Sequence, residues 1–319
     1  MEKLNFELLK SLYCIHSKSL QEKKMRKFLK KWIRENVSDV VMKNDSFGNL
    51  YITKGLSEDY PCLCAHMDQV QDMHPRDFTC IDANGVILGY SPKLRKQCGL
   101  GGDDKNGLFI ALSCLQAYDV IKCAFFVGEE IGCVGSRAAD VEFFKDCRFC
   151  IQIDRRGNSD MVTHIGNSLC SEDFIEAVNY REWGYNISNG LMTDVEALRE
   201  NGVELSCVNL SCGYYAPHSD EEFTVKEDVE KCYRFVCHII EDCTEVYPHE
   251  IYCGPYENYH SLYDEDNFQY DCYDYLDYVN PNATFEEVYA ELKRDYPKLD
   301  KSRMREIFDL YKSHQDFGN

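Results

Sequence analysis

Residues 99–130 have the sequence GLGGDDKNGLFIALSCLQAYDVIKCAFFVGEE. The glycine-rich turn at 101–107 opens an apolar run of helix length at 108–117, and AFFV at 124–127 is a continuous apolar run typical of a buried strand. Helix-length and strand-length segments keep alternating to about residue 240. Further strands of this series are expected at 149–153 and 205–210. This alternation predicts a three-layer α/β/α sandwich built on a mixed, mainly parallel sheet.

The flanking segments extend this domain on its N-terminal side and change character on its C-terminal side. Apolar residues recur at helical spacing within 1–36, which predicts two helices, and strand-like runs follow to residue 65. Tyrosine and acidic residues dominate 247–278, and the capping-box-like run TFEE at 284–287 precedes a last amphipathic stretch. We therefore divide the chain into a main domain at 1–243, a Tyr- and acid-rich linker or wrap at 244–280, and a small C-terminal helical pair at 281–319.

The composition argues against two kinds of partner. The 319 residues include 55 acidic and 35 basic side chains, for a formal net charge of −20. This charge has the wrong sign for binding nucleic acid phosphates or anionic lipid. The N-terminus lacks the basic and apolar regions of a signal peptide, and no run reaches the roughly 18 apolar residues of a membrane span. We expect a cytoplasmic protein that binds neither nucleic acid nor membrane.

The 18 cysteines are scattered through apolar, strand-like runs. Since no signal peptide is evident, we expect reduced thiols in the core rather than a disulfide framework. Cys147 and Cys150 have the spacing of a redox or zinc motif, but no second pair completes a tetrahedral site. A buried strand is the preferred interpretation of this pair.

Five short motifs place metal-competent side chains just after an expected strand or in the loop that follows one. They are CAHMD at 64–68, GGDDKNG at 101–107, FVGEEIG at 126–132, IQIDRRG at 151–157 and GYYAPHS at 213–219. Each has an ordinary explanation by itself, such as a structural histidine, a capped helix N-terminus or solvated surface acids. Together they offer His, Asp, Glu-Glu, Asp and His. This is the ligand set of two divalent ions that share a carboxylate, with one further carboxylate left as a base.

The order and flanks of these motifs resemble the co-catalytic dinuclear zinc exopeptidase superfamily, which includes peptidase T, glutamate carboxypeptidases, deacylases and zinc aminopeptidases. The likeness extends from about residue 5 to 243 and includes DSFGNL at 45–50. It implies two ions, expected to be zinc with cobalt or manganese as alternatives. The implied ligands are His66, Asp103 and Asp154 for one ion, and Asp103, Glu130 and His218 for the other, with Asp103 as the bridge.

The resemblance also implies roles for two further carboxylates. Asp68 would orient His66, and the two-residue period of a strand does place both on the same side. Glu129 would be the general base that takes a proton from the attacking water and returns it to the leaving nitrogen. A cis peptide bond between Asp103 and Asp104 is implied as well.

One departure from the tripeptidase pattern is large. The resemblance implies a lid or dimerisation domain between the positions of Asp154 and His218, with a lid histidine that steadies the oxyanion. Here only 155–217 is available, and it must already supply two helices and a strand, so we expect no lid. Candidates to replace the lid histidine are Tyr214, Tyr215 and His164. Thr193-Asp194 resembles the family's Thr-Asp pair, and support of the site or a helix N-cap at Thr193 are both open interpretations.

These observations predict a metal-dependent hydrolase that cleaves short peptides, as a monomer or small homo-oligomer. An aminopeptidase is the preferred form, because no lid cation is left to hold a substrate carboxylate and the negative charge attracts free amines. Arg155-Arg156 is counter-evidence, although structural ion pairing is the preferred role for it. The alternatives are an N-acyl amino acid deacylase, a carboxypeptidase with the same site, and a metal-retaining binding protein.

Overall fold

The strand-length apolar runs form a nine-stranded sheet in the order β1-β2-β7-β3-β8-β12-β9-β10, with β11 paired to β9. The structure is a computed structural model that describes residues 4–250, 272, 276, 283–295 and 300–315. The strands are β1 (Val40–Asn44), β2 (Leu50–Lys54), β3 (Tyr60–His66), β7 (Ile121–Phe126), β8 (Cys147–Arg155), β9 (Asp160–Ile165), β10 (Asn167–Ser168), β11 (Asn186–Asn189) and β12 (Cys207–Ser211). The central strands β7, β3, β8 and β12 are parallel to one another, whereas β1, β2 and β10 pair antiparallel at the margins.

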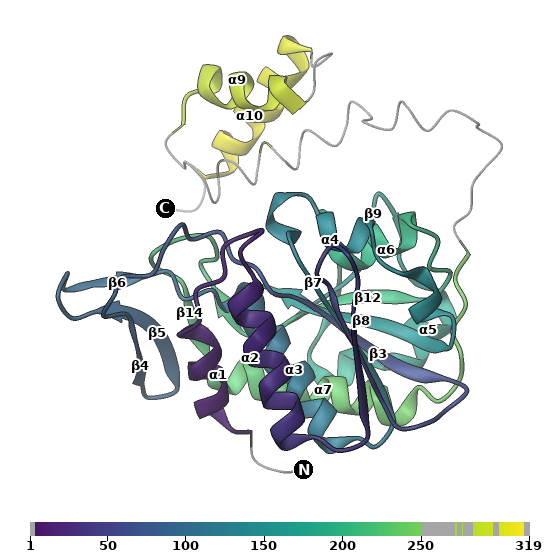
Figure 1. Cartoon of the computed structure of the whole chain (residues 1–319). Helices are drawn as coiled ribbons and strands as arrows, with labels where there is room; N and C mark the ends of the chain where they lie inside the picture. Colours follow the sequence, from purple (N-terminus) through teal and green to yellow (C-terminus); the bar gives the residue numbers. More distant parts are fainter. Residues whose placement is uncertain (1–3, 251–271, 273–275, 277–282, 296–299, 316–319) are drawn as a thin grey trace. The chain divides into compact units, whose positions relative to one another are not determined.

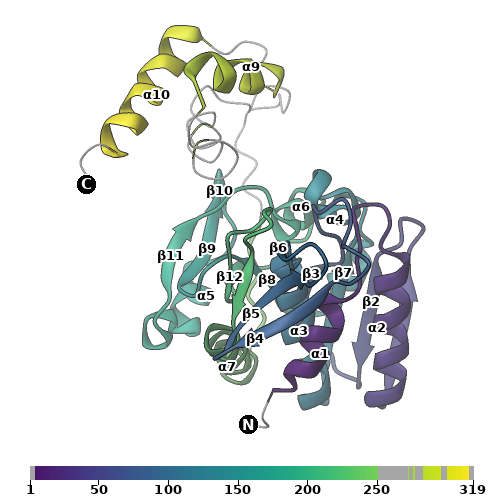
Figure 2. The same cartoon turned by 90° about the vertical axis from the view of Figure 1, so that its left-hand side faces the viewer.

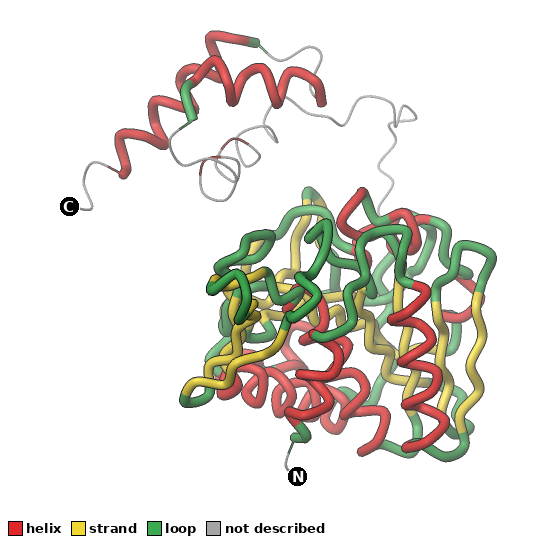
Figure 3. The backbone as a smooth tube through the Cα atoms, turned by 60° about the vertical axis from the view of Figure 1, so that its left-hand side comes forward, coloured by secondary structure: helices red, strands yellow, loops and turns green. Residues whose placement is uncertain are grey.

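Helices cover both faces of this sheet, which explains why the central strands are apolar on both sides (Figures 1 and 2). One face packs against α1 (Phe6–Tyr13), α2 (Lys23–Asn36), α3 (Gly102–Ala117), α5 (Glu172–Val178) and α7 (Lys226–Asp242). The other packs against η2 (Val141–Phe144) and α6 (Asp194–Glu200), and α4 (Val134–Arg137) lies against α6. The strands are thus enclosed between helical layers (Figure 3), as the predicted sandwich requires.

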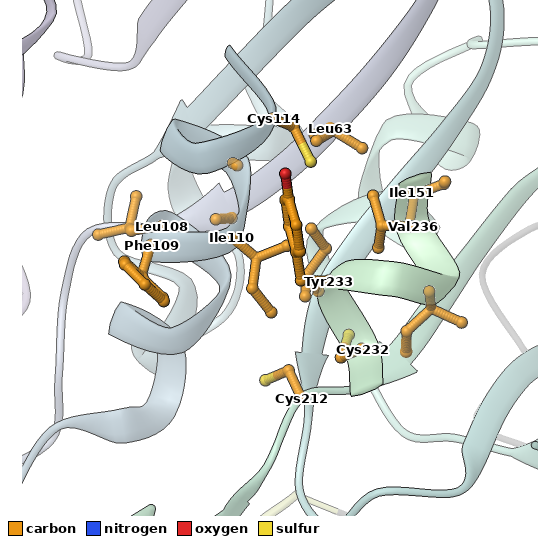
Figure 4. Packing of buried hydrophobic residues seen from close by; sticks show 14 of the residues in the cluster. Leu63, Leu108, Phe109, Ile110, Cys114, Ile151, Cys212, Cys232, Tyr233 and Val236 are labelled. Carbon is orange, nitrogen blue, oxygen red and sulfur yellow. The ribbon is translucent and has the colours of Figure 1, made fainter. Parts of the chain in front are cut away.

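The larger core lies where α3 and α7 meet the sheet. Ile110 and Cys114 of α3 and Tyr233 of α7 gather there with Leu63 of β3 (Figure 4). Gly107 brings α3 close to the sheet, because a Cβ at this position would lie 2.5 Å from the Ile153 carbonyl oxygen. This close approach sets the position of the first turn of α3, which carries Asp103.

A second, smaller antiparallel sheet was not predicted. Its order is β13-β14-β5-β4, with β6 paired to β5, and the hairpins project from the main sheet (Figure 1). The strands are β4 (Thr79–Ala83), β5 (Val86–Ser91), β6 (Lys96–Cys98), β13 (Tyr214–Tyr215) and β14 (Phe223–Val225). They were missed because β4 is largely exposed and the other strands are short or only half buried, which leaves little apolar signal.

The structure confirms the predicted fold class, including the small C-terminal helices α9 (Phe285–Asp295) and α10 (Lys301–Gln315). The chain divides into compact units at Ile251 and Tyr252. In the second unit, the Glu287 N–H donates to Thr284 Oγ1 at 3.4 Å and the Thr284 N–H to Glu287 Oε2 at 2.7 Å, which is the expected capping box. Most of the Tyr- and acid-rich segment, 251–271, lies outside the described residues.

Two predictions from composition can also be checked. Cys147 and Cys150 are buried in β8, and no disulfide joins any of the cysteines that the structure describes. Within the described residues, no helix has the length and apolar character needed to cross a membrane.

Candidate functional site

The predicted site residues gather at one edge of the main sheet, where the carboxyl ends of its parallel strands meet. His66 ends β3, Asp154 is the last residue but one of β8, and the acidic pair at 129–130 opens the 3₁₀ turn η1 (Glu129–Ile131) after β7. Asp103 lies in the first turn of α3 and His218 in the loop after β13. Two groups of ligand atoms each lie within 4.8 Å of one another: those of His66, Asp103 and Asp154, and those of Asp103, Glu130 and His218.

Asp103 lies between the two imidazoles. Its Oδ1 is 3.0 Å from His66 Nε2, and its Oδ2 is 3.3 Å from His218 Nε2. Asp154 Oδ1 lies 3.6 Å from His66 Nε2, and Glu130 Oε2 lies 3.1 Å from His218 Nε2. The five side chains therefore form two triads that share one carboxylate, and each of its oxygens faces a different triad.

The site has the polar groups of a metal centre. Glu130 Oε1 is buried and has no hydrogen-bond partner. Five carboxyl groups, those of Asp68, Asp103, Glu129, Glu130 and Asp154, crowd around two imidazoles. Buried carboxylates at this density are costly unless cations compensate them. Carboxylate oxygens and imidazole nitrogens are suitable ligands for zinc and related divalent ions, so the residues present fit two such ions.

Asp68 connects the end of β3 to the acidic pair. Its Oδ1 lies 3.4 Å from His66 Nδ1 and accepts the Glu129 N–H at 3.1 Å. Its Oδ2 accepts the Glu130 N–H at 3.2 Å and the Ser19 hydroxyl at 2.8 Å. Asp68 is fully buried. It therefore fixes the orientation of the imidazole and of both glutamates at once.

Glu129 belongs to neither triad but faces the first one. Its Oε2 lies 3.9 Å from His66 Nε2, and its Oε1 accepts a weak hydrogen bond from Cys133 Sγ at 3.7 Å. Burial and the negative charge of Asp154 raise the pKa of Glu129 well above its usual value, against the opposing effect of His66. A raised pKa suits a carboxyl group that accepts and returns a proton near neutral pH.

The pKa of Asp103, the carboxyl group shared by both triads, is shifted in the opposite direction. Burial opposes ionisation of Asp103, but hydrogen bonds from His218 and His66 outweigh it and hold the pKa of Asp103 well below its usual value. Burial likewise disfavours the cationic form of His218, yet Asp103 and Glu130 raise its pKa to about 11. The site thus holds Asp103 as a carboxylate and Glu129 as the more basic carboxyl group.

Two buried acids that the sequence analysis missed anchor the turn carrying Asp103. Glu222 Oε2 accepts the N–H groups of Leu100 at 2.9 Å and Gly101 at 2.6 Å, and its Oε1 accepts the Asp103 N–H at 3.1 Å. Asp104 Oδ2 accepts the His66 N–H at 3.1 Å. The Asp103-Asp104 peptide bond is cis, as expected. Glu222 is the last of three consecutive acids, so no local signal separates it from its neighbours.

Replacing Glu222 by Gln should destabilise the turn and weaken metal binding at Asp103. The amide nitrogen of Gln would oppose backbone N–H donors, so we expect a loss of about 2–3 kcal/mol in the free energy of unfolding. Denaturant unfolding of the metal-free protein and a metal titration measure the two effects. The control is Glu221→Gln, since Glu221 is exposed. Equal effects of both substitutions, or none from Glu222→Gln, would contradict the anchoring role.

Hydrogen bonds to Gln152 of β8 connect Thr193 and Asp194 to the site. The Thr193 hydroxyl donates to Gln152 Oε1 at 2.7 Å, and Gln152 Nε2 donates to Asp194 Oδ2 at 3.1 Å and to Asp154 Oδ2 at 3.3 Å. Thr193 precedes α6, but its side chain does not cap that helix. The geometry therefore favours support of the site over helix capping. Gln152 was missed, although a polar residue within the apolar strand and two positions before Asp154 is a usable signal.

The three candidates to replace a lid histidine differ in position. The Tyr214 hydroxyl is 3.3 Å from Asp154 Oδ1, which places it beside the first triad. The Tyr215 hydroxyl donates to Asp228 Oδ2 at 2.7 Å, and His164 Nδ1 interacts with the Thr163 hydroxyl at 2.9 Å. Of the three, Tyr214 is therefore the one whose hydroxyl contacts a residue of the site.

The segment between Asp154 and His218 also agrees with the expected absence of a lid. All of its residues are described, and they form β9 to β13 with α5, η3 (Tyr180–Trp183) and α6, which belong to the two sheets and their covering layers. Arg155 Nε lies 3.4 Å from Asp160 Oδ2, consistent with a structural ion pair.

The fold corresponds to the α/β/α sandwich of solved peptidase structures. No protein-family model and no curated protein matches the sequence. Among solved structures, an aminopeptidase PepT from Bacillus cereus aligns over 76% of this chain and 100% of its own, with 16% identity and a TM-score of 0.63.

Two other similar structures have the same fold. A tripeptidase from Staphylococcus aureus aligns over 76% of this chain and 99% of its own, with 17% identity and a TM-score of 0.61. The Pyrococcus horikoshii TET1 peptidase, described as able to assemble into a tetrahedron or a large octahedral shell, aligns over 74% and 98%, with 17% identity and a TM-score of 0.53. At these identities the comparisons establish the fold alone.

Proposed function

We propose that the chain is a dinuclear metal-dependent exopeptidase that removes N-terminal residues from short peptides. The observation that carries this proposal is the position of Asp103, with one oxygen 3.0 Å from His66 and the other 3.3 Å from His218. This arrangement supports one ion held by His66, Asp103 and Asp154, and a second held by Asp103, Glu130 and His218. Zinc is the proposed metal, with cobalt or manganese as alternatives. Such ions polarise a carbonyl group and allow water to attack it at neutral pH.

The residues of the chain would perform the proton transfers. Glu129, which lies outside both triads, accepts a proton from the attacking water and delivers it to the leaving amine. Asp68 accepts a hydrogen bond from the Glu129 N–H and lies beside His66, so it fixes the position of the base relative to the first triad. Tyr214 lies at the edge of the first triad. We assign it the stabilisation of the negative charge that develops on the carbonyl oxygen.

Charge favours recognition of a free amino terminus. The crowded carboxyl groups attract a cationic amine, and the net charge of −20 adds to this field. Arg155, a candidate for binding a substrate carboxylate, is close to Asp160 instead. The descriptions of the structural neighbours as aminopeptidases and a tripeptidase agree with this direction. An N-acyl amino acid deacylase or a carboxypeptidase would instead have to bind the free carboxylate of its substrate, which requires a cationic side chain at the same kind of site.

One tripeptide in four forms tests the direction of cleavage. With the metal-loaded protein, N-acetylation should lower kcat/KM by at least about 100-fold, because the recognised amine is lost, whereas C-amidation should change it little. The unmodified and doubly blocked peptides are the upper and lower references. Cleavage that survives N-acetylation and is lost on C-amidation would indicate a carboxypeptidase. Hydrolysis of acetylated single amino acids alone would indicate a deacylase.

A further inference from the structure

A second group of possible metal ligands lies within the core between the sheet and α6, and it consists of thiols. The sulfur atoms of Cys62, Cys64 and Cys150 lie within 4.8 Å of one another, and all three residues are fully buried. Cys62 and Cys64 share one side of β3 because they are two residues apart. Cys62 is in register with Cys150 on the adjacent strand β8. Among the described residues, this is the one group of three or more potential ligands formed by cysteines alone.

Two more thiols border this triad. The Cys147 thiol interacts with Cys62 and the Cys207 thiol with Cys150, while Cys147 Sγ also lies 3.9 Å from the Phe143 carbonyl oxygen and Cys207 Sγ lies 3.5 Å from the Leu205 carbonyl oxygen. Cys207 is in register with Cys150 on β12, so cysteines lie side by side on three adjacent parallel strands. Both are buried. Neither thiol lies within 4.8 Å of all three sulfur atoms of the triad, so a fourth ligand for a tetrahedral ion requires one of these side chains to move toward it.

Buried cations lie next to the thiols and can compensate the negative charge of thiolates. Lys122 is in register with Cys62 on β7 and is 5% exposed, and its ammonium donates to the Phe143 carbonyl at 2.8 Å and also pairs with the carboxylate of Asp146. Arg199 is also 5% exposed and interacts electrostatically with Cys150 and Cys207. Three or four thiolates around a cation leave a net negative charge, which a hydrophobic core tolerates poorly without such neighbours.

We propose that Cys62, Cys64 and Cys150, with Cys147 or Cys207, bind one thiophilic d10 cation, either Zn²⁺ or Cu⁺. Thiolate ligands select these ions. In a tetrahedral zinc site with Zn–S bonds of about 2.3 Å, the sulfur atoms are roughly 3.8 Å apart, so the triad needs only side-chain adjustments of about 1 Å. The ion would connect β3 and β8, the strands that carry His66 and Asp154, and would stabilise the sheet beneath the proposed active site.

A pair of buried cysteines on the opposite face of the sheet provides a control for the removal of thiols that only fill the core. Cys114 and Cys237 are buried there and are within hydrogen-bonding reach of each other. No third potential ligand joins them within 4.8 Å in the described residues. A pair of thiols lacks the donors for a stable site, so Cys114→Ala/Cys237→Ala matches the test variant in burial and in the number of thiols removed.

Cadmium is the probe, because thiolate-to-cadmium charge transfer gives an ultraviolet absorption that carboxylate and histidine ligands do not give. Reduced, full-length protein is unfolded, freed of metal and refolded with Cd²⁺. We expect one thiolate-bound cadmium per chain and a higher Tm than without metal. The absorption should fall at least about fivefold in Cys62→Ala/Cys150→Ala and in the milder Cys150→Ala, but persist in the control pair. Persistence in Asp103→Asn shows that the thiol site is independent of the proposed peptidase centre.

The proposal is overturned if the wild-type protein shows no thiolate–cadmium absorption, if the absorption survives in Cys62→Ala/Cys150→Ala, or if the control pair loses it equally. A wild-type protein without the absorption overturns the proposal even if a variant fails to fold, and Cys150→Ala, which removes a single thiol, then carries the test of location. Metal analysis of protein produced with zinc or with Cu⁺ and reductant then identifies the ion. Zinc above the content of the carboxylate site supports Zn²⁺, and copper that is lost in Cys150→Ala supports Cu⁺.

Discussion

Glu129→Gln is expected to abolish most of the turnover while both ions remain bound. The amide keeps the size of the side chain but cannot accept a proton, and general-base catalysis contributes on the order of 10²–10⁴-fold. Glu129 Oε2 lies 3.9 Å from His66 Nε2, and Glu129 belongs to neither ligand group. We therefore expect kcat to fall within that range, with little change in metal content. Steady-state kinetics and elemental analysis of the same preparation measure both quantities.

The neighbouring glutamate provides the matched control. Glu130 Oε2 lies 3.1 Å from His218 Nε2, and its other oxygen is buried without a partner, as expected for a ligand. Glu130→Gln should therefore reduce metal content together with activity. The assignment of roles within the acidic pair is wrong if Glu129→Gln stays fully active, or if it loses metal as readily as Glu130→Gln.

The sequence predicted the fold class, and for a physical reason it also grouped side chains that the structure places close together. Parallel strands end at one edge of a sheet, so polar residues that follow apolar runs meet there even when they are far apart in the chain. His66 and Asp154 follow this rule directly, because β3 and β8 are adjacent. Asp103 lies in the first turn of α3 and not at a strand end, but the glycine-rich turn indicated its position.

What the sequence did not reveal depends on contacts between distant segments. Glu222 accepts hydrogen bonds from the turn at 100–103, which lies more than a hundred residues earlier in the chain. No local sequence pattern distinguishes Glu222 from the acidic residues before it. The antiparallel sheet that places Glu222 there was missed for the same reason, since its strands are short and weakly apolar. Thr193 could be assigned to support or to capping only after its partner Gln152 was identified.

Asp103→Ala is expected to release both ions, whereas loss of a histidine should release one. Each oxygen of Asp103 faces a different imidazole, so removing this carboxylate takes a ligand from both triads. His66→Ala and His218→Ala each take a ligand from a single triad. Metal content should therefore fall from about two ions per chain to near zero in Asp103→Ala, and to about one in either histidine variant. Activity of Asp103→Ala should fall on the order of 10⁴-fold or more, since the reaction loses both cations.

Asp160→Asn is the control for removing an aspartate near the site, because Asp160 is close to Arg155 and belongs to neither triad. It should retain both ions and most of the activity. Unfolding curves of metal-free proteins separate a loss of binding from a loss of fold. Because His218 and His66 hold the pKa of Asp103 well below its usual value, the carboxylate stabilises the metal-free fold at neutral pH, and the metal-free Asp103→Ala protein should be less stable than the metal-free wild type but still folded. Retention of two ions by a folded Asp103→Ala protein would show that Asp103 is not the bridge, and equal losses in all three variants would show that the triads bind metal as one unit.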